Sequence, residues 1–263
     1  MNSESIGIFD SGFGGLTVMK AICHLLPHEN MIYFGDTGRL PYGTKSKETI
    51  LRYSFENAEF LCNKGIKILV IACHTACSFA LAELEQKLSI PVIGVTTPAV
   101  EHVSKTSSSG HIAVLGTHGT IRSGMYEKTF LELFPKASIT SIPCQLLVHL
   151  VEEGYIDHPI TEAALQEYLE PLQSKNIETL LLGCTHFPLL QEQIEKLISS
   201  NIRVIDPAEY CAQSVKTLLE NGNLLNDSTD IPHYEFFVSD DPEKFQTLGA
   251  RFLGQPLKNV KNA

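Results

Sequence analysis

The stretch Leu69–Ser78 reads LVIACHTACS, and a second stretch, Thr179–Leu189, reads TLLLGCTHFPL. In each, a short apolar run ends at a small residue. A cysteine comes next, and threonine and histidine follow it closely. This pattern is typical of a buried parallel strand that leads into a βα turn. We therefore expect Cys73 and Cys184 at the carboxyl ends of two strands, where open α/β sheets bind their ligands. Two such cysteines on one chain suggest one shared site.

The rest of the chain alternates between strand-like and helix-like segments. The further candidate strands are short and rich in Ile, Val and Leu, and they cover residues 5–10, 31–35, 91–95, 111–116, 138–143, 202–206 and 234–238. Apolar residues recur with helical spacing between most of them, as in residues 16–26, 48–65, 160–173 and 208–222. This alternation predicts α/β layers with largely parallel sheets.

Breaks in composition predict two domains, for which a chain of 263 residues is long enough. A Ser-rich turn within VSKTSSSGHIAVLG precedes a fresh strand, so we place one boundary just before it, near Thr97 and Pro98. The second boundary is at Asp206–Pro207. We expect two similar doubly wound, largely parallel-sheet α/β domains, 1–97 plus 207–263 and 98–206, with the active site in the cleft between them.

Charge and hydropathy limit the partners. The formal net charge is −10, and there is no block of consecutive Lys or Arg, so nucleic acid is not expected as a partner. The first residues, MNSESIGIFD, lack the basic and long apolar segments of a signal peptide. The longest apolar runs are too short to span a bilayer. We expect a soluble, cytoplasmic protein without a membrane partner.

The seven cysteines are an odd number scattered along the chain, which favours free thiols over a disulfide framework. Beside Cys73 and Cys184, we expect the others to be structural, because none ends an apolar strand ahead of a helix start. These are Cys23, Cys62, Cys77, Cys144 and Cys211.

Two alternative sites are considered from local patterns. Gly12, Gly14 and Gly15 follow the first strand as in a dinucleotide-binding turn, but Thr17 stands where the third glycine belongs. Cysteine and histidine are zinc ligands, and the candidate set is Cys73, His74, Cys77, Cys184 and His186. Cys77, however, lies four residues into an expected helix rather than on a turn. A nucleotide-binding protein and a zinc module remain open as alternatives.

Other residues at expected strand ends fit a small amino-acid ligand. Asp10 and Ser11 offer an acceptor and a hydroxyl to an ammonium group, although Asp10 is equally suited to cap the first helix. In the loop YFGDTGRLPYGTKS, the Gly43 amide and the Tyr42 hydroxyl are able to take a carboxylate if this loop lies beside the first cysteine.

A thiol at a helix start is expected to have a pKa below about 8.5, and hence to act as a base. His186, two residues after Cys184, is placed to relay a proton or to orient that thiol.

Four motifs, DSGFGG, the PYG loop, ACHTA and GCTHFPLL, appear in this order, and together they resemble the glutamate racemase family across essentially the whole chain. The resemblance implies a cofactor-independent and metal-free enzyme that interconverts L- and D-glutamate for peptidoglycan synthesis. We also expect a homodimer. A racemase of another acidic amino acid is the alternative within the same class.

The resemblance also implies roles for single residues. Cys73 and Cys184 are the two acid/base residues, and Glu152 is expected to assist on the side of His186, with Glu153 adjacent to it. The residues expected to bind substrate or assist the thiols are Asp10, Ser11, Tyr42, Gly43, His74, Thr75, Thr185 and His186. The family usually has Asn where this chain has His74, and a neutral imidazole presents its donor and acceptor at a different reach from an amide and is also able to become charged.

Overall fold

The strands form two separate sheets in the computed structural model, which describes residues 3–228 and 230–263. Sheet A has the order β10-β9-β2-β1-β3-β4 and sheet B the order β6-β5-β7-β8, and every pair is parallel. The strands of sheet A are β1 (Ser5–Asp10), β2 (Met31–Gly35), β3 (Ile66–Ile71), β4 (Val92–Gly94), β9 (Tyr234–Val238) and β10 (Val260–Asn262). The strands of sheet B are β5 (His111–Gly116), β6 (Ser138–Pro143), β7 (Thr179–Gly183) and β8 (Arg203–Ile205).

Helices follow most of these strands, as the helical spacing of apolar residues indicated. In the part of the chain built on sheet A they are α1 (Leu16–Leu25), α2 (Lys47–Cys62), α3 (His74–Lys87) and α11 (Pro242–Leu253), with short 3-10 turns η1 (Thr37–Arg39) and η2 (Tyr42–Thr44). The others are α4 (Thr96–Thr106), α5 (His118–Arg122), α6 (Met125–Leu133), α7 (Gln145–Glu152), α8 (Pro159–Gln173), η3 (Phe187–Leu190), α9 (Gln191–Leu197) and α10 (Pro207–Asn221).

Both sheets repeat the same strand order. The order β2-β1-β3-β4 in sheet A and β6-β5-β7-β8 in sheet B is in each case second, first, third, fourth along the chain. This is a doubly wound order, in which ligands bind beyond the carboxyl ends of the first and third strands. The predicted fold class, two similar parallel-sheet α/β units, is confirmed. Strands β3 and β7 occupy equivalent places, and these are the strands that the cysteines follow.

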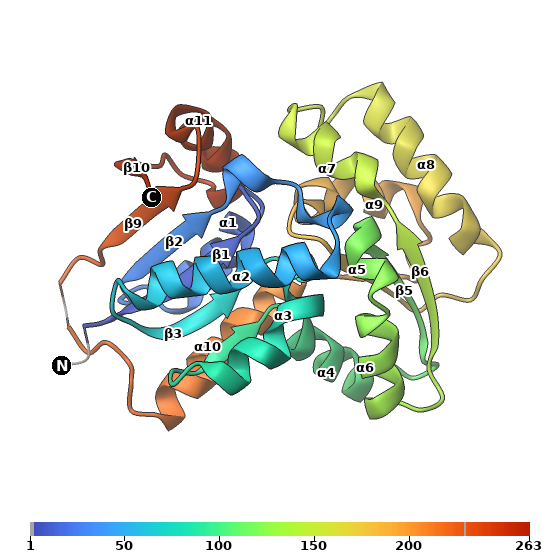
Figure 1. The fold of residues 1–263 in the computed structure, drawn as a ribbon. Helices are drawn as coiled ribbons and strands as arrows, with labels where there is room; N and C mark the ends of the chain where they lie inside the picture. Colours follow the sequence, from blue (N-terminus) through green and yellow to red (C-terminus); the bar gives the residue numbers. More distant parts are fainter. Residues whose placement is uncertain (1–2, 229) are drawn as a thin grey trace.

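Figure 1 shows the two units side by side, and we call the one built on sheet A the first lobe and the one built on sheet B the second lobe. Helix α10 packs against α1 of the first lobe and also against α4, whose apolar face joins the core of sheet B through Ala99, Val100 and Val103. We propose that the lobes are domains with the limits expected from the sequence, 1–97 with 207–263 and 98–206.

The strands that carry the site are buried, which explains their uninterrupted apolar sequences. All residues of β3 and β7 are buried, as expected for parallel strands with helices on both faces. Strand β6 differs, because most of SITSIP is only partly buried. The strand β10 was not expected from the sequence, because its three residues carry no apolar run.

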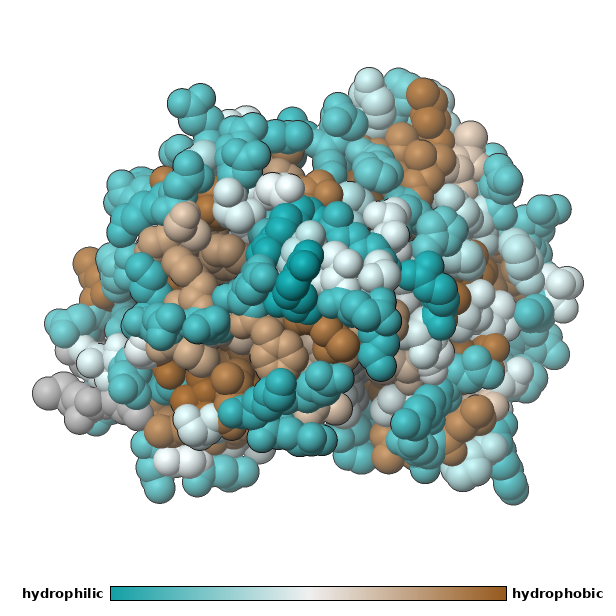
Figure 2. Space-filling view, viewed as in Figure 1, coloured by the Kyte–Doolittle hydropathy of each residue, from teal (hydrophilic) through white to brown (hydrophobic). Residues whose placement is uncertain are grey.

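Polar side chains cover most of the face drawn in Figure 2, including the junction of the lobes, and apolar surface appears over the α7–α8 region. Within the described residues, no helix is long and apolar enough to cross a membrane.

Candidate active site

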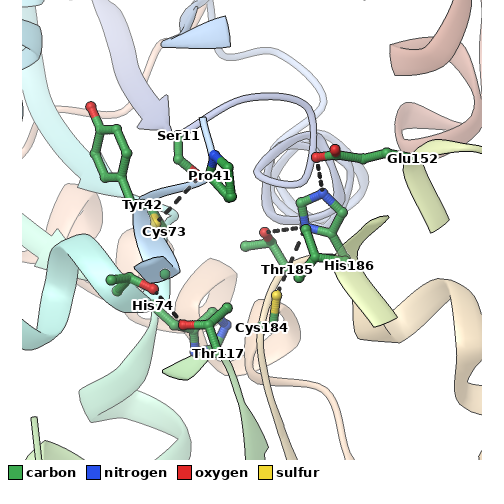
Figure 3. A pocket seen from close by; sticks show the side chains of 13 residues that line it. Ser11, Pro41, Tyr42, Cys73, His74, Thr117, Glu152, Cys184, Thr185 and His186 are labelled. Atoms are coloured by element: carbon green, nitrogen blue, oxygen red, sulfur yellow. Dashed lines mark hydrogen bonds and ion pairs between the residues drawn. The ribbon is translucent and has the colours of Figure 1, made fainter. Parts of the chain in front are cut away.

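One small pocket lies where the carboxyl ends of the two sheets meet (Figure 3). Both Cys73 and Cys184 line it, so the structure brings the two strand-end cysteines together as the sequence indicated. The other lining residues are Ser11, Pro41, Tyr42, Gly43, His74, Thr75, Thr117, Val148, Glu152, Thr185 and His186. Its volume is about 20 Å³, which is room for about one water molecule.

Cys73 is the N-cap residue of α3, which places its sulfur at the start of a helix. The amide of Ala76 donates to Cys73 Sγ at 3.5 Å, and the thiol lies 3.7 Å from Ser11 Oγ. Burial, followed by the negative charge of Asp10, raises the pKa of the Cys73 thiol to about 12, although Ala76 and Ser11 act in the other direction. The expected lowering of this pKa is therefore wrong for this structure, because burial outweighs the helix terminus.

Asp10 is buried at the end of β1 and does not cap the first helix. The N-cap of α1 is Gly15, which makes no side-chain capping bond. One carboxylate oxygen of Asp10, Oδ2, accepts from the Gly12 amide at 2.9 Å, and the other, Oδ1, has no partner among the described residues. Burial raises the pKa of Asp10, and the positive charge of His186 partly opposes this. A buried acceptor without a partner is suited to a ligand that donates hydrogen bonds.

Cys184 faces a histidine that a carboxylate holds in place. His186 Nδ1 lies 3.8 Å from Cys184 Sγ, and His186 Nε2 lies 3.0 Å from Glu152 Oε1 (Figure 3). Burial lowers the pKa of His186, but hydrogen bonds to Cys184 and Glu152 and the negative charges of both outweigh it and raise the pKa to about 10. The neighbouring Glu153 is exposed, so Glu152 is the acid that reaches this side of the pocket.

The segment after Cys184 differs from the expected helix start. A 3-10 turn, η3, begins at Phe187, and the following helix α9 begins only at Gln191. The Phe187 amide donates to the Cys184 carbonyl at 3.1 Å, which closes a tight turn that places His186 against Cys184. Thr185 lines the pocket beside it, and its carbonyl accepts from the Thr17 hydroxyl of α1 at 3.1 Å.

The loop with Tyr42 and Gly43 lines the pocket, but the Tyr42 hydroxyl is directed away from it (Figure 3). That hydroxyl donates to Asp36 and accepts from Asn57 Nδ2 at 3.0 Å. The expectation that it takes a carboxylate is therefore wrong for this structure, because a buried acid already occupies it. Asp36 also accepts from Arg39, so this network holds the loop beside the pocket.

His74 and Thr75 join the two lobes. Thr75 Oγ1 lies 2.8 Å from Thr117 Oγ1 and 3.0 Å from Thr120 Oγ1 in the second lobe. His74 Nδ1 lies 2.7 Å from the Tyr126 hydroxyl, and burial lowers the pKa of His74 to about 3. His74 is therefore neutral near pH 7, and its side chain bonds to the protein as well as lining the pocket.

The glycine-rich turn after β1 meets the second lobe. A Cβ at Gly14 would lie 2.2 Å from Thr185 Oγ1 and 2.6 Å from His186 Nδ1. A Cβ at Gly15 would lie 2.5 Å from the Asp10 Cβ. The glycines thus permit close approach of protein to protein, which accounts for them without a bound dinucleotide.

All seven cysteines are free. Five of them were expected to be structural because none ends a strand ahead of a helix start, and one of the five does not fit this description. Cys144 does lie between a strand, β6, and the start of a helix, α7, whose N-cap it is. Residues 138–143 were expected to form a strand, but the partly polar sequence SITSIP kept it from being counted as an apolar strand ahead of a helix start. Cys77 donates to the Ile71 carbonyl at 3.1 Å. Among the described residues, no three His, Cys, Asp or Glu side chains are placed to hold a metal ion.

Sequence reasoning missed three pocket residues, Pro41, Thr117 and Val148, and also Tyr126, which contacts His74 without lining the pocket. Thr117 directly follows the strand HIAVLG. It therefore carries the same signal as Cys73, a polar residue at the carboxyl end of an apolar strand. Val148 and Tyr126 lie inside helices, where nothing in the local pattern separates a residue that contributes to the site from an ordinary core residue.

Comparison with known proteins agrees with this geometry. The family model for Asp/Glu/hydantoin racemases matches residues 14–215. The chain belongs to this racemase family. A glutamate racemase of Geobacter metallireducens is 46% identical over 257 residues, which are 98% of this chain and 95% of that protein.

Solved racemase structures are similar over the whole chain. Glutamate racemase isoform RacE1 of Bacillus anthracis has a TM-score of 0.96 and 38% identity, and the match covers 100% of this chain and 98% of that one. Glutamate racemase of Francisella tularensis, in complex with D-glutamate, has a TM-score of 0.94 and 37% identity, with the same coverage. The resemblance indicated by the four motifs is confirmed, and the chain is an enzyme of the racemase class.

The contact between Glu152 and His186 predicts a pH-dependent stability. A histidine whose folded pKa is about 10 and whose ordinary pKa is 6.5 stabilises the folded state fully below pH 6.5 and loses this contribution as the pH rises toward 10. Glu152→Gln removes one cause of the raised pKa. We expect its loss of stability relative to the unaltered protein to be largest near pH 6 and to shrink toward pH 10, as measured by urea unfolding.

Glu153→Gln is the matched control, because Glu153 is exposed and is expected to leave the urea midpoint nearly unchanged at every pH. An equal loss of stability by Glu152→Gln at all pH values would show that the carboxylate does not hold His186 charged.

The neutral, bonded state of His74 predicts a modest role in turnover. His74→Asn removes one hydrogen bond to Tyr126, so we expect racemisation to stay within about tenfold of the unaltered rate. Tyr126→Phe, which removes the same bond from the other side, should have a similar effect in an initial-rate assay. A thousandfold loss in His74→Asn alone would instead assign proton transfer to this histidine.

Proposed function

We propose that this protein is a cofactor-independent glutamate racemase, which interconverts L- and D-glutamate by proton transfer between two cysteines. One observation carries the proposal: Cys73 and Cys184 follow equivalent strands of two like sheets and line one pocket. We further propose that it supplies D-glutamate for peptidoglycan synthesis and acts in the cytoplasm, as a homodimer.

Racemisation by two bases needs two groups in different protonation states, one on each face of the α-carbon. The surroundings of the two thiols support this difference. Cys73 is close to the buried carboxylate of Asp10, which disfavours its ionisation, whereas Cys184 lies 3.8 Å from His186, whose pKa is raised by its contacts with Cys184 and Glu152. In the proposed cycle one thiol is deprotonated when the other is protonated, and each turnover exchanges the two states.

The proposed substrate itself supplies the charge that Cys73 lacks. Ionising a thiol with a pKa of about 12 near pH 7 costs about 7 kcal/mol. A substrate ammonium bound to the free Oδ1 of Asp10 removes one cause of that cost. A cation about 4 Å from the thiolate adds roughly 4 kcal/mol at an effective dielectric constant of 20. The two effects bring Cys73 into the range of a useful base only while an amino acid is bound.

The α-carboxylate is proposed to bind beside the cysteines. The first turn of α3 starts directly after Cys73, and its free amides favour an anion there. Thr185 offers a hydroxyl directly after Cys184. Donors placed where charge spreads during proton removal stabilise the carbanion as it forms.

Substrate entry requires the lobes to separate or their side chains to move. The pocket of about 20 Å³ is far smaller than an amino acid such as glutamate. Opening would break polar contacts between the lobes, among them Thr75 to Thr117 and Thr17 to Thr185. We infer that the described arrangement is the closed state, in which water is excluded during the reaction.

The direct test is circular dichroism of L-glutamate incubated with purified protein and no added cofactor. We expect the signal to decay to zero as the racemic mixture forms, with L-aspartate changing much more slowly. A constant glutamate signal in the presence of folded protein would contradict the proposed function, and faster decay with aspartate would favour the alternative substrate.

Single replacement of either cysteine tests the two-base assignment. A serine hydroxyl is too weakly acidic to serve as the base, so Cys73→Ser and Cys184→Ser should each lower racemisation by orders of magnitude. Elimination from a substrate with a leaving group on its β-carbon needs proton removal from one face only. Each variant should then eliminate from one enantiomer, and the two variants should prefer opposite enantiomers.

Cys62→Ser serves as the control, because this thiol is free and lies outside the pocket. Retention of the same enantiomer by both variants, or normal racemisation by either, would remove Cys73 and Cys184 from the roles proposed for them.

A further inference from the structure

Gln145 is a buried amide without a partner. It is the first residue of α7 and is 7% exposed. Neither its Nε2 nor its Oε1 has a hydrogen-bond partner among residues 3–228 and 230–263. Burying an amide without hydrogen bonds is costly, and such groups in folded proteins usually have a ligand or ordered water as their partner. The second lobe therefore holds a donor and an acceptor that the chain itself does not use.

The position of Gln145 on α7 relates it to the pocket. Gln145, Val148 and Glu152 are spaced by three and four residues, so their side chains follow one face of the helix. Val148 and Glu152 both line the pocket, which shows that this face is the one turned toward it. Gln145 thus continues a row of side chains whose other members already form the pocket wall.

The amide of Gln145 lies against the loop of the first lobe. A Cβ at Gly43 would lie 2.4 Å from Gln145 Oε1 and 2.6 Å from Thr117 Cβ. Gly43 and Thr117 line the pocket, so the amide lies beside two of its wall residues. Rotation of the amide by half a turn exchanges Nε2 and Oε1, and either atom can therefore face this wall.

The two ends of α7 meet different parts of the site. Glu152 contacts His186, which faces the reacting cysteine Cys184. Gln145 is seven residues earlier, roughly 10 Å along the helix axis, and beside Gly43. The α-carbon of the substrate must lie between the two sulfurs, and the α-carboxylate is bonded directly to this carbon. The part of an acidic amino acid that extends toward Gly43 and Gln145 is then the distal end of its side chain.

Resting on the proposed racemisation of glutamate, we propose that the Gln145 side-chain amide binds the distal carboxylate of the substrate and selects its length. The Nε2 group donates to one carboxylate oxygen when the substrate occupies the closed site. Aspartate is one methylene shorter, so its distal carboxylate falls short of Gln145 when its α-carbon is held between the thiols. A site that leaves a buried donor unpaired rejects the shorter substrate.

The test compares Gln145→Leu, which keeps a similar volume without the amide, with the unaltered protein in steady-state assays on L-glutamate and L-aspartate. We expect KM for glutamate to rise about tenfold or more, as for a lost hydrogen bond to a charged group, with kcat within about threefold. The preference for glutamate over aspartate, as a ratio of kcat/KM values, should fall by a similar factor.

Thermal unfolding separates binding from a structural role. Without ligand, Gln145→Leu should melt no lower than the unaltered protein, because an unpaired buried amide has been removed. Saturating L-glutamate should raise its Tm less than that of the unaltered protein at the same concentration. Gln166→Leu, the same exchange at an exposed position of α8, should leave KM, the substrate preference and both Tm values unchanged.

The outcomes separate the two proposals. If the unaltered protein does not racemise glutamate, the proposed function fails and this inference fails with it. If it does, and Gln145→Leu keeps both the KM and the preference for glutamate, only the role of Gln145 is overturned. A ligand-free Tm several degrees lower in Gln145→Leu would also overturn it, because the amide would then have a structural partner.

Discussion

The close approach of the two lobes at Gly14 is the constraint on which the site depends. No side chain fits at this position, because even a Cβ would lie 2.2 Å from Thr185 Oγ1 and 2.6 Å from His186 Nδ1. The absence of a side chain lets the β1–α1 turn, with Asp10 and Ser11, reach the turn that carries Cys184. Any larger residue would separate the carboxyl ends of the two sheets and admit water between the thiols.

Closure sets the electrostatics of the site as well as its shape. Burial alone disfavours every charge in the pocket, and it is the largest cause acting on Cys73, Asp10 and His186. His186 overcomes it through two partners, whereas Asp10 retains an oxygen with no partner and Cys73 remains a weak acid. The charged group on the Cys184 side thus has partners within the protein, whereas Asp10 on the Cys73 side keeps one oxygen without a partner among the described residues. In the proposed function, the substrate ammonium group is the charge that the Cys73 side lacks, and it ties the activation of Cys73 to the binding of an amino acid.

The sequence was sufficient for the parts of this arrangement that depend on local pattern. The buried strands β3 and β7 have uninterrupted apolar runs, and the cysteine that follows each one marks the ligand-binding edge of a parallel sheet. Contacts between the lobes carry no such local signal. The bond of the Tyr42 hydroxyl to Asp36 and the pairing of His74 with Tyr126 join residues far apart in the chain. The pKa of Cys73 was misjudged for a related reason, because the helix start is visible in the sequence and the depth of burial is not.

The repeated strand order gives the two halves of the site equivalent scaffolds and unlike chemistry. Cys73 and Cys184 follow the third strand of each sheet, so their positions correspond, but α3 begins at once after the first and only a 3-10 turn follows the second. The helix start supplies amides to Cys73, and the tight turn supplies His186 to Cys184. The proposed reaction acts on both faces of one carbon and needs a thiol on each side of it, for which the common fold provides two equivalent strand ends. It also needs one thiol to hold a proton while the other lacks it, and the different segments after the two strands provide that difference.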